Sequence, residues 1–429
     1  MAVVADIESM FHQVRVSLRD RDALRFLWWP GGNTEEKPVA YRMTVHLFGA
    51  KSSPSCAAFC LKEAAKEFGK YFEPNIARNV QRCFYVDDFL SCSRNCAEGI
   101  KLVEGMREIM AMAGFNLTKW QSTSAKVMES IPDSHKGKAE SDKLFGNDTE
   151  NVVLGIKWSL AKDEFYFAVE KLSEARKLTK QVLLSATNSL YDPLGFLAPV
   201  VLEARLIYRN ACREQRDWDE QLSDETGKRW KRWCTSLDQL RDIRIPRCCQ
   251  VDSEHQGLQL HFFSDASSFA RGCVCYLRIT RYNNVIECYL VMGKALLADK
   301  KRTIPQLELE AALDAVKMSR VVKKELELED CMCMFWTDSS AVLLSLRADS
   351  RQFPVYFKNR LARIQQYTSV HDWRHVPTDL NPADQASRGA TAAVLLKTET
   401  WLHGPKFLYK RPELWPDHPL QKQVVSYSL

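Results

Sequence analysis

Apolar and polar positions along the first part of the chain follow the periods of strands and of one helix. The segment LRFLWW, a turn at residues 30–33 and the alternating segment YRMTVHL predict a β-hairpin over residues 24–47. The run SSPSCAAFCLKEAAKEFG then has apolar residues at helical spacing behind a Ser/Pro turn, which predicts a helix over residues 52–69. A short apolar strand follows at residues 82–92, with the sequence RCFYVDDFLSC.

The last third of the chain has its own succession of elements. LQLHFFSDASSFARGCVCYLRI alternates as two strands over residues 258–279, and TIPQLELEAALDAVKMSRVV is an amphipathic helix over residues 303–322. CMCMFWTDSSAVLLSL begins as an apolar strand that ends at Asp338, and WRHVPTDLNPADQASRG ends in a turn. Residues 122–150 are polar and without periodicity, which predicts a surface loop or linker. The pattern therefore predicts a multidomain protein of the α+β and α/β classes.

Bulk composition limits the class of protein without defining its chemistry. A chain of 429 residues predicts two or three domains, and its 45% of hydrophobic residues can fill their cores. The net charge of +6 permits nucleic-acid binding and does not demonstrate it. The 14 cysteines are scattered and form no paired C-x-x-C units with His at finger spacing, which indicates reduced thiols in an intracellular protein. Since neither a signal peptide nor a run of about 18 apolar residues is visible, we expect a soluble protein with no membrane partner.

Two adjacent aspartates, Asp87 and Asp88, stand inside the apolar strand RCFYVDDFLSC. Removing two like charges from water is costly unless cations neutralise them, and two magnesium ions would do so. Asp6, in the apolar segment MAVVADIESMF, offers a third carboxylate from a neighbouring strand. Three such carboxylates predict a two-metal site for nucleotidyl transfer, with ions about 4 Å apart.

These stretches resemble the palm motifs of reverse transcriptases, in particular those of the Pao/BEL group of long-terminal-repeat retrotransposons. The segment DPLGFLAPV at residues 192–200 is similar to the thumb and connection region of the same group, so the resemblance covers nearly the whole chain. It implies an RNA-directed DNA polymerase in which Asp6, Asp87 and Asp88 are the catalytic metal ligands. It also implies nucleotide contacts from Phe11, which would exclude a ribose 2′ hydroxyl, and from Phe48, Gly49 and Tyr85, and a primer grip at Leu154 and Gly155.

Four acids of the last third resemble, in order and context, the acidic residues of the ribonuclease H fold that follows the polymerase in retroelements: Asp265, Glu308, Asp338 and Asp384. Two metals, an attacking water and an RNA phosphodiester require about four carboxylates on rigid elements. Glu308 is preferred to Glu310, because residues two apart on a helix face different sides and Glu308 followed by Leu309 fits the family pattern. His375 lies ahead of a Val-Pro pair, so neither it nor His371 is assigned a catalytic role.

The resemblance also implies a division of the chain and a set of ligands. It implies two Mg²⁺ ions per site, with Mn²⁺ as an alternative, and as partners an RNA template, a DNA primer, an RNA/DNA hybrid and deoxynucleotides. Protease, fingers and integrase regions are expected elsewhere in the same polyprotein, and the expected location is the cytoplasm, including virus-like particles. The implied segments are a palm lacking fingers (1–121), a linker (122–150), a primer-grip strand with thumb and connection helices (151–250), a ribonuclease H-like mixed-sheet domain (255–392) and a tether towards integrase (393–429).

Two alternatives to a working polymerase stay open at this point. Polymerisation needs the template and nucleotide in near-attack geometry, and a misplacement of about 1 Å costs on the order of a hundredfold, so missing fingers would leave a chain that is only a nuclease. The other alternative is a non-catalytic nucleic-acid-binding remnant. Each acid alone also has a structural explanation: Asp338 as a helix N-cap, Glu308 as a first-turn charge and Asp384 as a turn residue.

Overall fold

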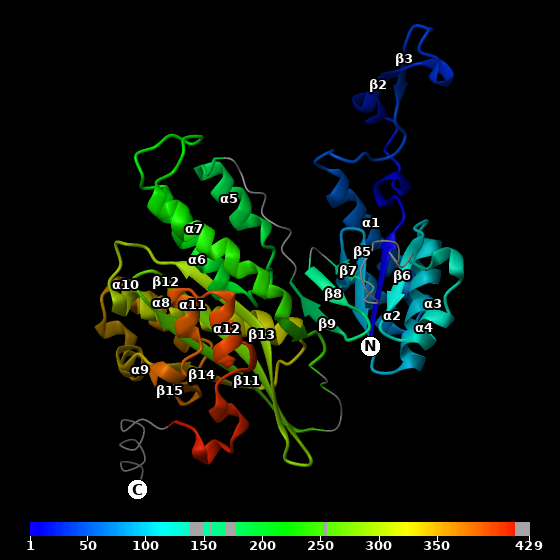
Figure 1. Cartoon of the computed structure of the whole chain (residues 1–429). Coiled ribbons are helices and arrows are strands. Elements are labelled where there is room, and N and C mark those ends of the chain that lie inside the picture. The colour runs from blue at the N-terminus through cyan, green and yellow to red at the C-terminus, as the bar shows by residue number, and fades with distance from the viewer. Residues whose placement is uncertain (138–149, 154–155, 168–176, 250, 252–254, 417–429) are drawn as a thin grey trace. The chain divides into compact units, whose positions relative to one another are not determined.

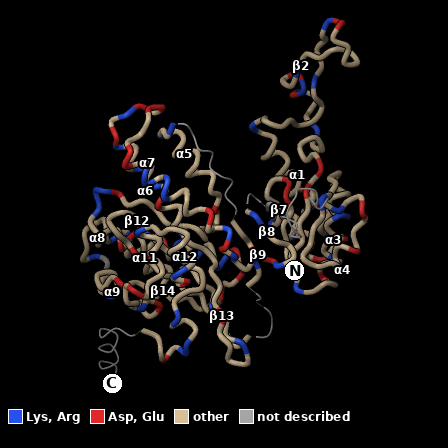
Figure 2. The backbone as a smooth tube through the Cα atoms, viewed as in Figure 1, with Lys and Arg blue, Asp and Glu red and all other residues tan. Residues whose placement is uncertain are grey.

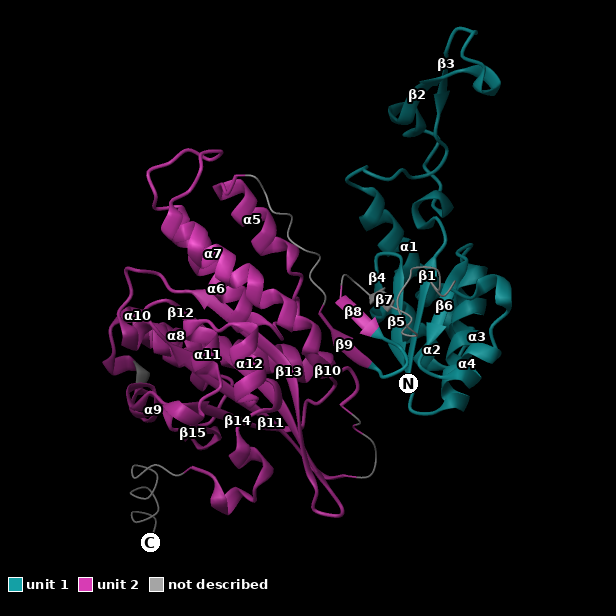
Figure 3. Cartoon of the chain, in the orientation of Figure 1, with its two compact units in different colours: residues 1–154, 159–163 teal, residues 155–158, 164–429 magenta. Residues whose placement is uncertain are grey.

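The computed structural model describes residues 1–137, 150–153, 156–167, 177–249, 251 and 255–416 and divides into two compact units (Figures 1 and 3). Unit 1 comprises residues 1–154 and 159–163, and unit 2 comprises residues 155–158 and 164–429. No helix among the described residues combines the length and the apolar composition that crossing a membrane requires.

Unit 1 is built on a four-stranded antiparallel sheet in the order β4-β5-β1-β6. Its strands are β1 (Ala2–Ile7), β4 (Phe84–Tyr85), β5 (Asp88–Cys92) and β6 (Leu117–Ser122). Its helices are α1 (Ser53–Phe68), α2 (Pro74–Arg82), α3 (Cys96–Met112) and α4 (Ala125–Glu129), and a further strand is β7 (Glu150–Val153). The helix predicted over residues 52–69 is confirmed as α1.

The alternation of β1 decides which face of this sheet carries chemistry. Val3, Ala5 and Ile7 are buried in one cluster with residues of α1, α2 and α3. Successive side chains of a strand point to opposite faces, so Asp6 lies on the face away from those helices. Phe89 of β5 belongs to the same core, which leaves the neighbouring Asp88 on the face of Asp6.

The predicted hairpin forms, but outside the sheet of unit 1. Strands β2 (Arg25–Trp28) and β3 (Val39–Arg42) pair only with each other, and all their residues are exposed. Figure 1 shows the hairpin extending from the body of unit 1. Within the described part of the chain, no strand of the four-stranded sheet pairs with this hairpin, and its second strand lies at the start of the predicted segment rather than along all of it.

Part of the predicted linker at residues 122–150 is also structured. Helix α4 begins after Ser124, whose side-chain oxygen accepts a hydrogen bond from the Val127 backbone N–H at 3.4 Å. Val127 and Ile131 are buried in the core of unit 1. The described residues up to 137 therefore belong to the palm unit, because these two apolar side chains, four positions apart, anchor them to it.

Unit 2 is built on a five-stranded mixed sheet in the order β13-β12-β11-β14-β15. Its first three strands are antiparallel, whereas β14 runs parallel to β11 and β15 runs parallel to β14. A smaller sheet contains β8, β9 and β10. The strands are β8 (Ile156–Ser159), β9 (Glu164–Tyr166), β10 (Arg244–Pro246), β11 (His255–Ala266), β12 (Ala270–Arg281), β13 (Ile286–Leu297), β14 (Met332–Thr337) and β15 (Trp373–His375).

Helices cover the five-stranded sheet on both faces. Phe262 of β11 is buried in a cluster with residues of α8, and the next residue, Phe263, is buried in a second cluster with residues of α6. Because neighbouring side chains enter different cores, the central strands are apolar without a polar face. The helices of unit 2 are α5 (Lys180–Ser189), α6 (Ala198–Ala211), α7 (Asp224–Ser236), α8 (Ile304–Glu325), α9 (Ser340–Arg347), α10 (Val355–Gln365), α11 (Ala383–Arg388), α12 (Ala392–Thr398) and α13 (Thr400–His403).

The segment DPLGFLAPV locks α6 onto the sheet. The Asp192 carboxylate accepts hydrogen bonds from the backbone N–H groups of Phe196 at 2.9 Å and Leu197 at 2.8 Å, just before α6 begins. The Gly293 N–H of β13 donates to the Leu194 carbonyl at 2.9 Å, so the turn runs against the edge of the sheet. This segment therefore attaches the start of α6 to β13.

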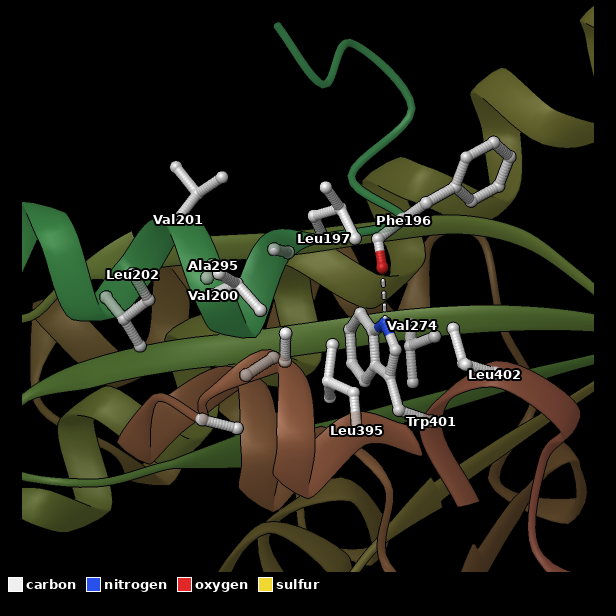
Figure 4. Close-up of a cluster of buried hydrophobic side chains, with 14 of the residues drawn as sticks. Phe196, Leu197, Val200, Val201, Leu202, Val274, Ala295, Leu395, Trp401 and Leu402 are labelled. Atoms are coloured by element: carbon white, nitrogen blue, oxygen red, sulfur yellow. Dashed lines mark hydrogen bonds between the residues drawn. The ribbon is translucent and has the colours of Figure 1, made fainter. Parts of the chain in front are cut away.

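The described part of the predicted tether, residues 393–416, packs into the fold of unit 2. Trp401, Leu408 and Trp415 are buried in the same core as α6 and the sheet. The Trp401 indole N–H donates to the Phe196 carbonyl at 2.7 Å (Figure 4). The structure likewise does not separate the predicted thumb and connection from the ribonuclease H-like domain, because α6, α7 and the sheet share this core.

Candidate active sites

Three of the four acids predicted in unit 2 converge at one end of the mixed sheet. Asp265 is near the end of β11, Asp338 directly follows β14, and these strands are parallel neighbours, so their carboxyl ends meet. Glu308 reaches the same place from the first turns of α8. One carboxylate oxygen from each of the three lies within 4.8 Å of the others. Within the described part of the chain, no other group of three His, Cys, Asp or Glu side chains meets this criterion.

Asp384 stands beside this cluster, in the first turn of α11, and is paired with a cation. The Arg388 Nε atom lies 2.5 Å from the Asp384 Oδ1 atom, one helical turn away. The fourth predicted acid is thus near the other three without being one of the converging group. Its charge still reaches them, because it contributes to the raised pKa of Asp265.

The cluster is electrostatically unfavourable without a cation. Burial, reinforced by Asp265 and Asp338, raises the pKa of Glu308 to about 9. Burial also raises the pKa of Asp265 to about 6, against a hydrogen bond from the Ser387 hydroxyl. The Glu308 Oε2 atom is buried and has no hydrogen-bond partner. Leaving a buried acceptor unpaired costs about 1–3 kcal/mol. The described residues supply no hydrogen-bond donor or cation to this oxygen.

Glu310 has a different environment. Its Oε2 atom lies 2.6 Å from Arg271 Nη1, and its Oε1 atom accepts hydrogen bonds from the Tyr356 hydroxyl at 2.5 Å and from Arg360 Nη2 at 3.0 Å. The carboxylate is therefore neutralised by a network that ties α8 to β12 and α10. This geometry agrees with the preference for Glu308 as the metal ligand.

In unit 1, Asp6 of β1 is directly opposite Asp88 of β5. Asp87 occupies the two-residue turn between β4 and β5, and its carbonyl accepts a hydrogen bond from the Ile7 N–H at 2.9 Å. Val86, the other residue of this turn, has a φ of 57°. A β-branched residue in that region costs on the order of 1–3 kcal/mol, so Asp87 lies in a strained turn immediately before Asp88 of β5.

The three acids of unit 1 differ from those of unit 2 in the spacing of their carboxylates and in having a lysine paired with one of them. Burial, followed by the charges of Asp87 and Asp6, raises the pKa of Asp88. The Lys119 ammonium of β6 lies 3.2 Å from the Asp6 Oδ2 atom and offsets part of this repulsion. Their carboxylate oxygens do not converge within the 4.8 Å reached in unit 2.

The predicted nucleotide contacts of unit 1 lie in two places. Phe11, in the turn Met10–Gln13, is buried, and its ring meets the ring of Phe48 edge-on at 5.0 Å between centroids. Phe48 itself is 64% exposed, and Gly49 has a φ of 84° with open space where a Cβ would lie. Tyr85 is exposed beside Asp88 in the hairpin. The predicted primer-grip residues Leu154 and Gly155 lie outside the described residues.

Two family models match the chain, one in each unit. The model of the reverse transcriptase (RNA-dependent DNA polymerase) family matches residues 1–143, and that of the Pao retrotransposon-like ribonuclease H-like domain matches residues 179–339. The chain is therefore similar to a reverse transcriptase over its first part and to a Pao retrotransposon ribonuclease H-like domain over residues 179–339. The family resemblance expected from the motifs is confirmed, and the second match begins inside the range predicted as thumb and connection.

Two solved structures are similar to this chain at low sequence identity. A foamy viral protease-reverse transcriptase, solved as a dRH form with double-stranded DNA, aligns at 13% identity and a TM-score of 0.50, covering 87% of this chain and 56% of that chain. The same kind of protein solved with an RNA/DNA hybrid aligns at 12% identity and a TM-score of 0.49, covering 88% and 44%. This chain thus spans about half the length of these proteins, and the first likeness confirms the fold class. No curated protein matches the sequence.

Sequence analysis did not identify several polar residues that hold the acids of the ribonuclease H-like domain. Thr378 Oγ1 donates to Asp338 Oδ2 at 2.8 Å, and Asn381 Nδ2 lies 3.5 Å from Asp338 Oδ1 and 3.1 Å from the Ser264 carbonyl. Ser387 donates to Asp265. All three belong to the segment VPTDLNPADQASR, which also contains Asp384. Their closeness in sequence to this predicted acid is the one signal that points to them.

The raised pKa of Glu308 predicts an unusual pH dependence of the ribonuclease H-like domain in the absence of metal. A carboxyl that titrates near 9 when folded and near 4.5 when unfolded favours the folded state at low pH, and this contribution is lost as the pH rises from about 4.5 towards 9. Between pH 5 and pH 8 in chelator, we expect wild-type protein to lose about 1–3 kcal/mol of stability relative to Glu308→Gln. Denaturant unfolding of both proteins across this range measures the difference. Parallel stability curves would contradict the assignment, and magnesium should raise the wild-type curve selectively.

Proposed function

We propose that this chain cleaves the RNA strand of RNA/DNA hybrids in unit 2 and copies RNA into DNA in unit 1. The observation that carries the first activity is the convergence of Asp265, Glu308 and Asp338 at the meeting carboxyl ends of β11 and β14. Asp384 is the proposed fourth acid, since it stands next to the cluster and acts on Asp265. The reverse transcriptase and ribonuclease H-like family matches support both activities.

The residues of unit 2 fit divalent cations. Hard carboxylate oxygens are the ligands that Mg²⁺ prefers, and Glu308 Oε2 is a buried acceptor without a partner. Asp265, Glu308, Asp338 and Asp384 would hold two Mg²⁺ ions, with Mn²⁺ as an alternative. When bound, such ions lower the pKa of a coordinated water and polarise a phosphoryl oxygen. Ser387 orients Asp265, while Thr378 and Asn381 orient Asp338, so the ligands are positioned before the substrate binds.

In unit 1, Asp6, Asp87 and Asp88 are the proposed metal ligands for DNA synthesis. Phe48, Gly49 and Tyr85 are exposed enough to meet a deoxynucleotide, the templating base or the primer end. Phe11 is packed against Phe48, which fixes its ring in the position proposed to exclude a ribose 2′ hydroxyl. The substrates proposed for this unit are an RNA template, a DNA primer and deoxynucleotides.

A nuclease without polymerase activity is a second candidate, and one observation favours it. The acids of unit 1 do not converge as those of unit 2 do, and Lys119 occupies one oxygen of Asp6. A single experiment separates the candidates: a labelled RNA template annealed to a labelled DNA primer is incubated with the chain, magnesium and deoxynucleotides, and both strands are resolved on one gel. The matched variants are Asp87→Asn and Asp265→Asn.

The two strands report the two activities independently. We expect RNA cleavage that Asp265→Asn reduces at least about a thousandfold and that Asp87→Asn leaves intact, because the acids lie in different units. Primer extension that only Asp87→Asn abolishes would establish the polymerase. An unextended primer beside Asp265-dependent cleavage would identify a nuclease, and no product on either strand would leave a nucleic-acid-binding protein as the better interpretation.

A further inference from the structure

Unit 2 contains a cavity of about 500 Å³, and six of its 14 lining residues are cations. It is bounded by α6 and the residues that follow it, by α7, by the β11–β12 turn, by the start of α8 with the residues before it, and by α11. Figure 2 marks the Lys and Arg positions of α6 and α7 in blue. Two acids, Glu203 and Asp299, also line it. The cationic residues of its wall are Arg209, Arg213, Arg229, Lys300, Arg302 and Arg388.

The charges of this wall do not cancel among themselves. Arg229 pairs with Glu203 at 3.1 Å, and Arg302 lies 3.7 Å from Asp299. Within the described part of the chain, Arg209, Arg213 and Lys300 have no carboxylate within ion-pair distance. Three positive charges therefore face one cavity without a counter-charge.

Two further observations indicate that an anion would be favoured there. Burial, followed by the charge of Arg213, lowers the pKa of Arg209. The pKa of Lys300 is also lowered, first by its own desolvation and then by the charges of Arg213 and Arg209. The Arg209 Nη1 atom donates a hydrogen bond to the Phe269 carbonyl at 3.0 Å. The Arg209 Nε atom is buried and has no hydrogen-bond partner among the described residues. An oxyanion would satisfy this donor and offset the repulsion among the three cations.

Several residues that line the cavity are close in the chain to the acids of the proposed nuclease site, and one of them pairs with Asp384. Arg388 lines the cavity and also pairs with Asp384, and Leu307, another wall residue, precedes Glu308. Ser268 and Phe269 of the wall follow Asp265 by three and four residues. A nucleic-acid strand whose scissile phosphate lies at the acids would therefore present a neighbouring phosphate to this cavity.

We infer that this cavity is a phosphate-binding pocket in which Arg209, Arg213 and Lys300 hold a backbone phosphate of the RNA strand close to the scissile one. The inference rests on the proposed ribonuclease function for the identity of the strand. Arg209 and Arg213 come from α6 and the turn after it, outside the strands that carry the acids. They are positioning residues: they fix the register of the strand and do not touch the reacting atoms.

The test measures binding and cleavage separately in the full chain. Binding of a labelled RNA/DNA hybrid is measured in the Asp265→Asn background over a range of salt concentrations, with and without Arg209→Ala plus Arg213→Ala. The matched control is Arg232→Ala, an exposed arginine of α7 that does not line the cavity. A second set of hybrids replaces single RNA-strand phosphates by neutral methylphosphonates.

We expect the double variant to bind about tenfold more weakly and to reduce the salt slope of log K by about 1, with Arg232→Ala unchanged. A methylphosphonate at one position near the cleavage site should weaken hybrid binding when Arg209 and Arg213 are both present. The same methylphosphonate should cause no further loss of affinity in the double variant. With Asp265 restored, the double variant should raise KM and leave kcat within about threefold. Arg213→Ala alone should show about half of the effect on a logarithmic scale, which protects the test if Arg209→Ala disturbs the fold.

Equal affinity and salt slope in the double variant and the control would overturn the pocket. A loss spread evenly over all methylphosphonate positions would overturn it too, because it would indicate a diffuse charge effect. If wild-type protein cuts no hybrid but the position-specific coupling persists, the proposed nuclease function fails while the phosphate pocket stands.

Discussion

Glu308→Gln is expected to reduce hybrid cleavage on the order of a thousandfold or more, whereas Glu310→Gln should keep kcat within about threefold. Glu308 shares a buried cluster with Asp265 and Asp338 and leaves one oxygen free for a cation. Glu310 instead gives both oxygens to Arg271, Tyr356 and Arg360. Losing one carboxylate charge from the cluster removes a metal ligand, while losing the other weakens a structural network.

The two variants are matched controls for each other, since they make the same chemical change two residues apart on α8. Single-turnover cleavage of a labelled hybrid gives the rates, and denaturant unfolding gives the stabilities. Glu310→Gln should lower stability by about 1–3 kcal/mol, because it leaves partly buried arginines without their counter-charge. Full activity in Glu308→Gln, or loss of activity in a well-folded Glu310→Gln, would exchange the two assignments.

The acids of unit 2 could be predicted from sequence because each has a local signal. Asp265 and Asp338 stand at the ends of apolar strands, and Glu308 is near the start of an amphipathic helix, so element type and position were readable. What brings them together is the parallel pairing of β11 with β14, which involves residues far apart in the chain. The pairing of Asp384 with Arg388 depends on side-chain placement and could not be read from spacing alone.

Other predictions went wrong where packing between distant segments decides the outcome. The β2–β3 hairpin was correctly predicted as a local unit, yet its placement outside the palm sheet depends on which strands accept a neighbour. Residues after 392 were assigned to a tether by the family resemblance, whereas Trp401 and Trp415 are buried in the core shared with α6. Isolated aromatic residues in irregular segments give no periodic signal, so their burial appears only in the folded structure.

The segment DPLGFLAPV contains none of the proposed catalytic acids, and its effect is expected on stability. Gly195→Ala should destabilise unit 2 by about 3 kcal/mol or more. Gly195 has a φ of 71°, and a Cβ built on it would lie 1.9 Å from the Gly293 carbonyl oxygen of β13. Because the obstructing atom belongs to the backbone, alanine could be accommodated only if the turn moved away from β13. That movement would also break the hydrogen bond from the Gly293 N–H to the Leu194 carbonyl.

Gly227→Ala is the matched control for this substitution. Gly227 lies in α7, and no atom lies within 4 Å of its built Cβ, so alanine should be neutral or stabilise the helix by up to about 1 kcal/mol. Urea unfolding followed by circular dichroism compares both variants with the wild type. A Gly195→Ala protein as stable as Gly227→Ala would show that the turn does not press on β13. A selective loss would show that this motif is retained to dock α6, and with it Arg209, beside the nuclease site.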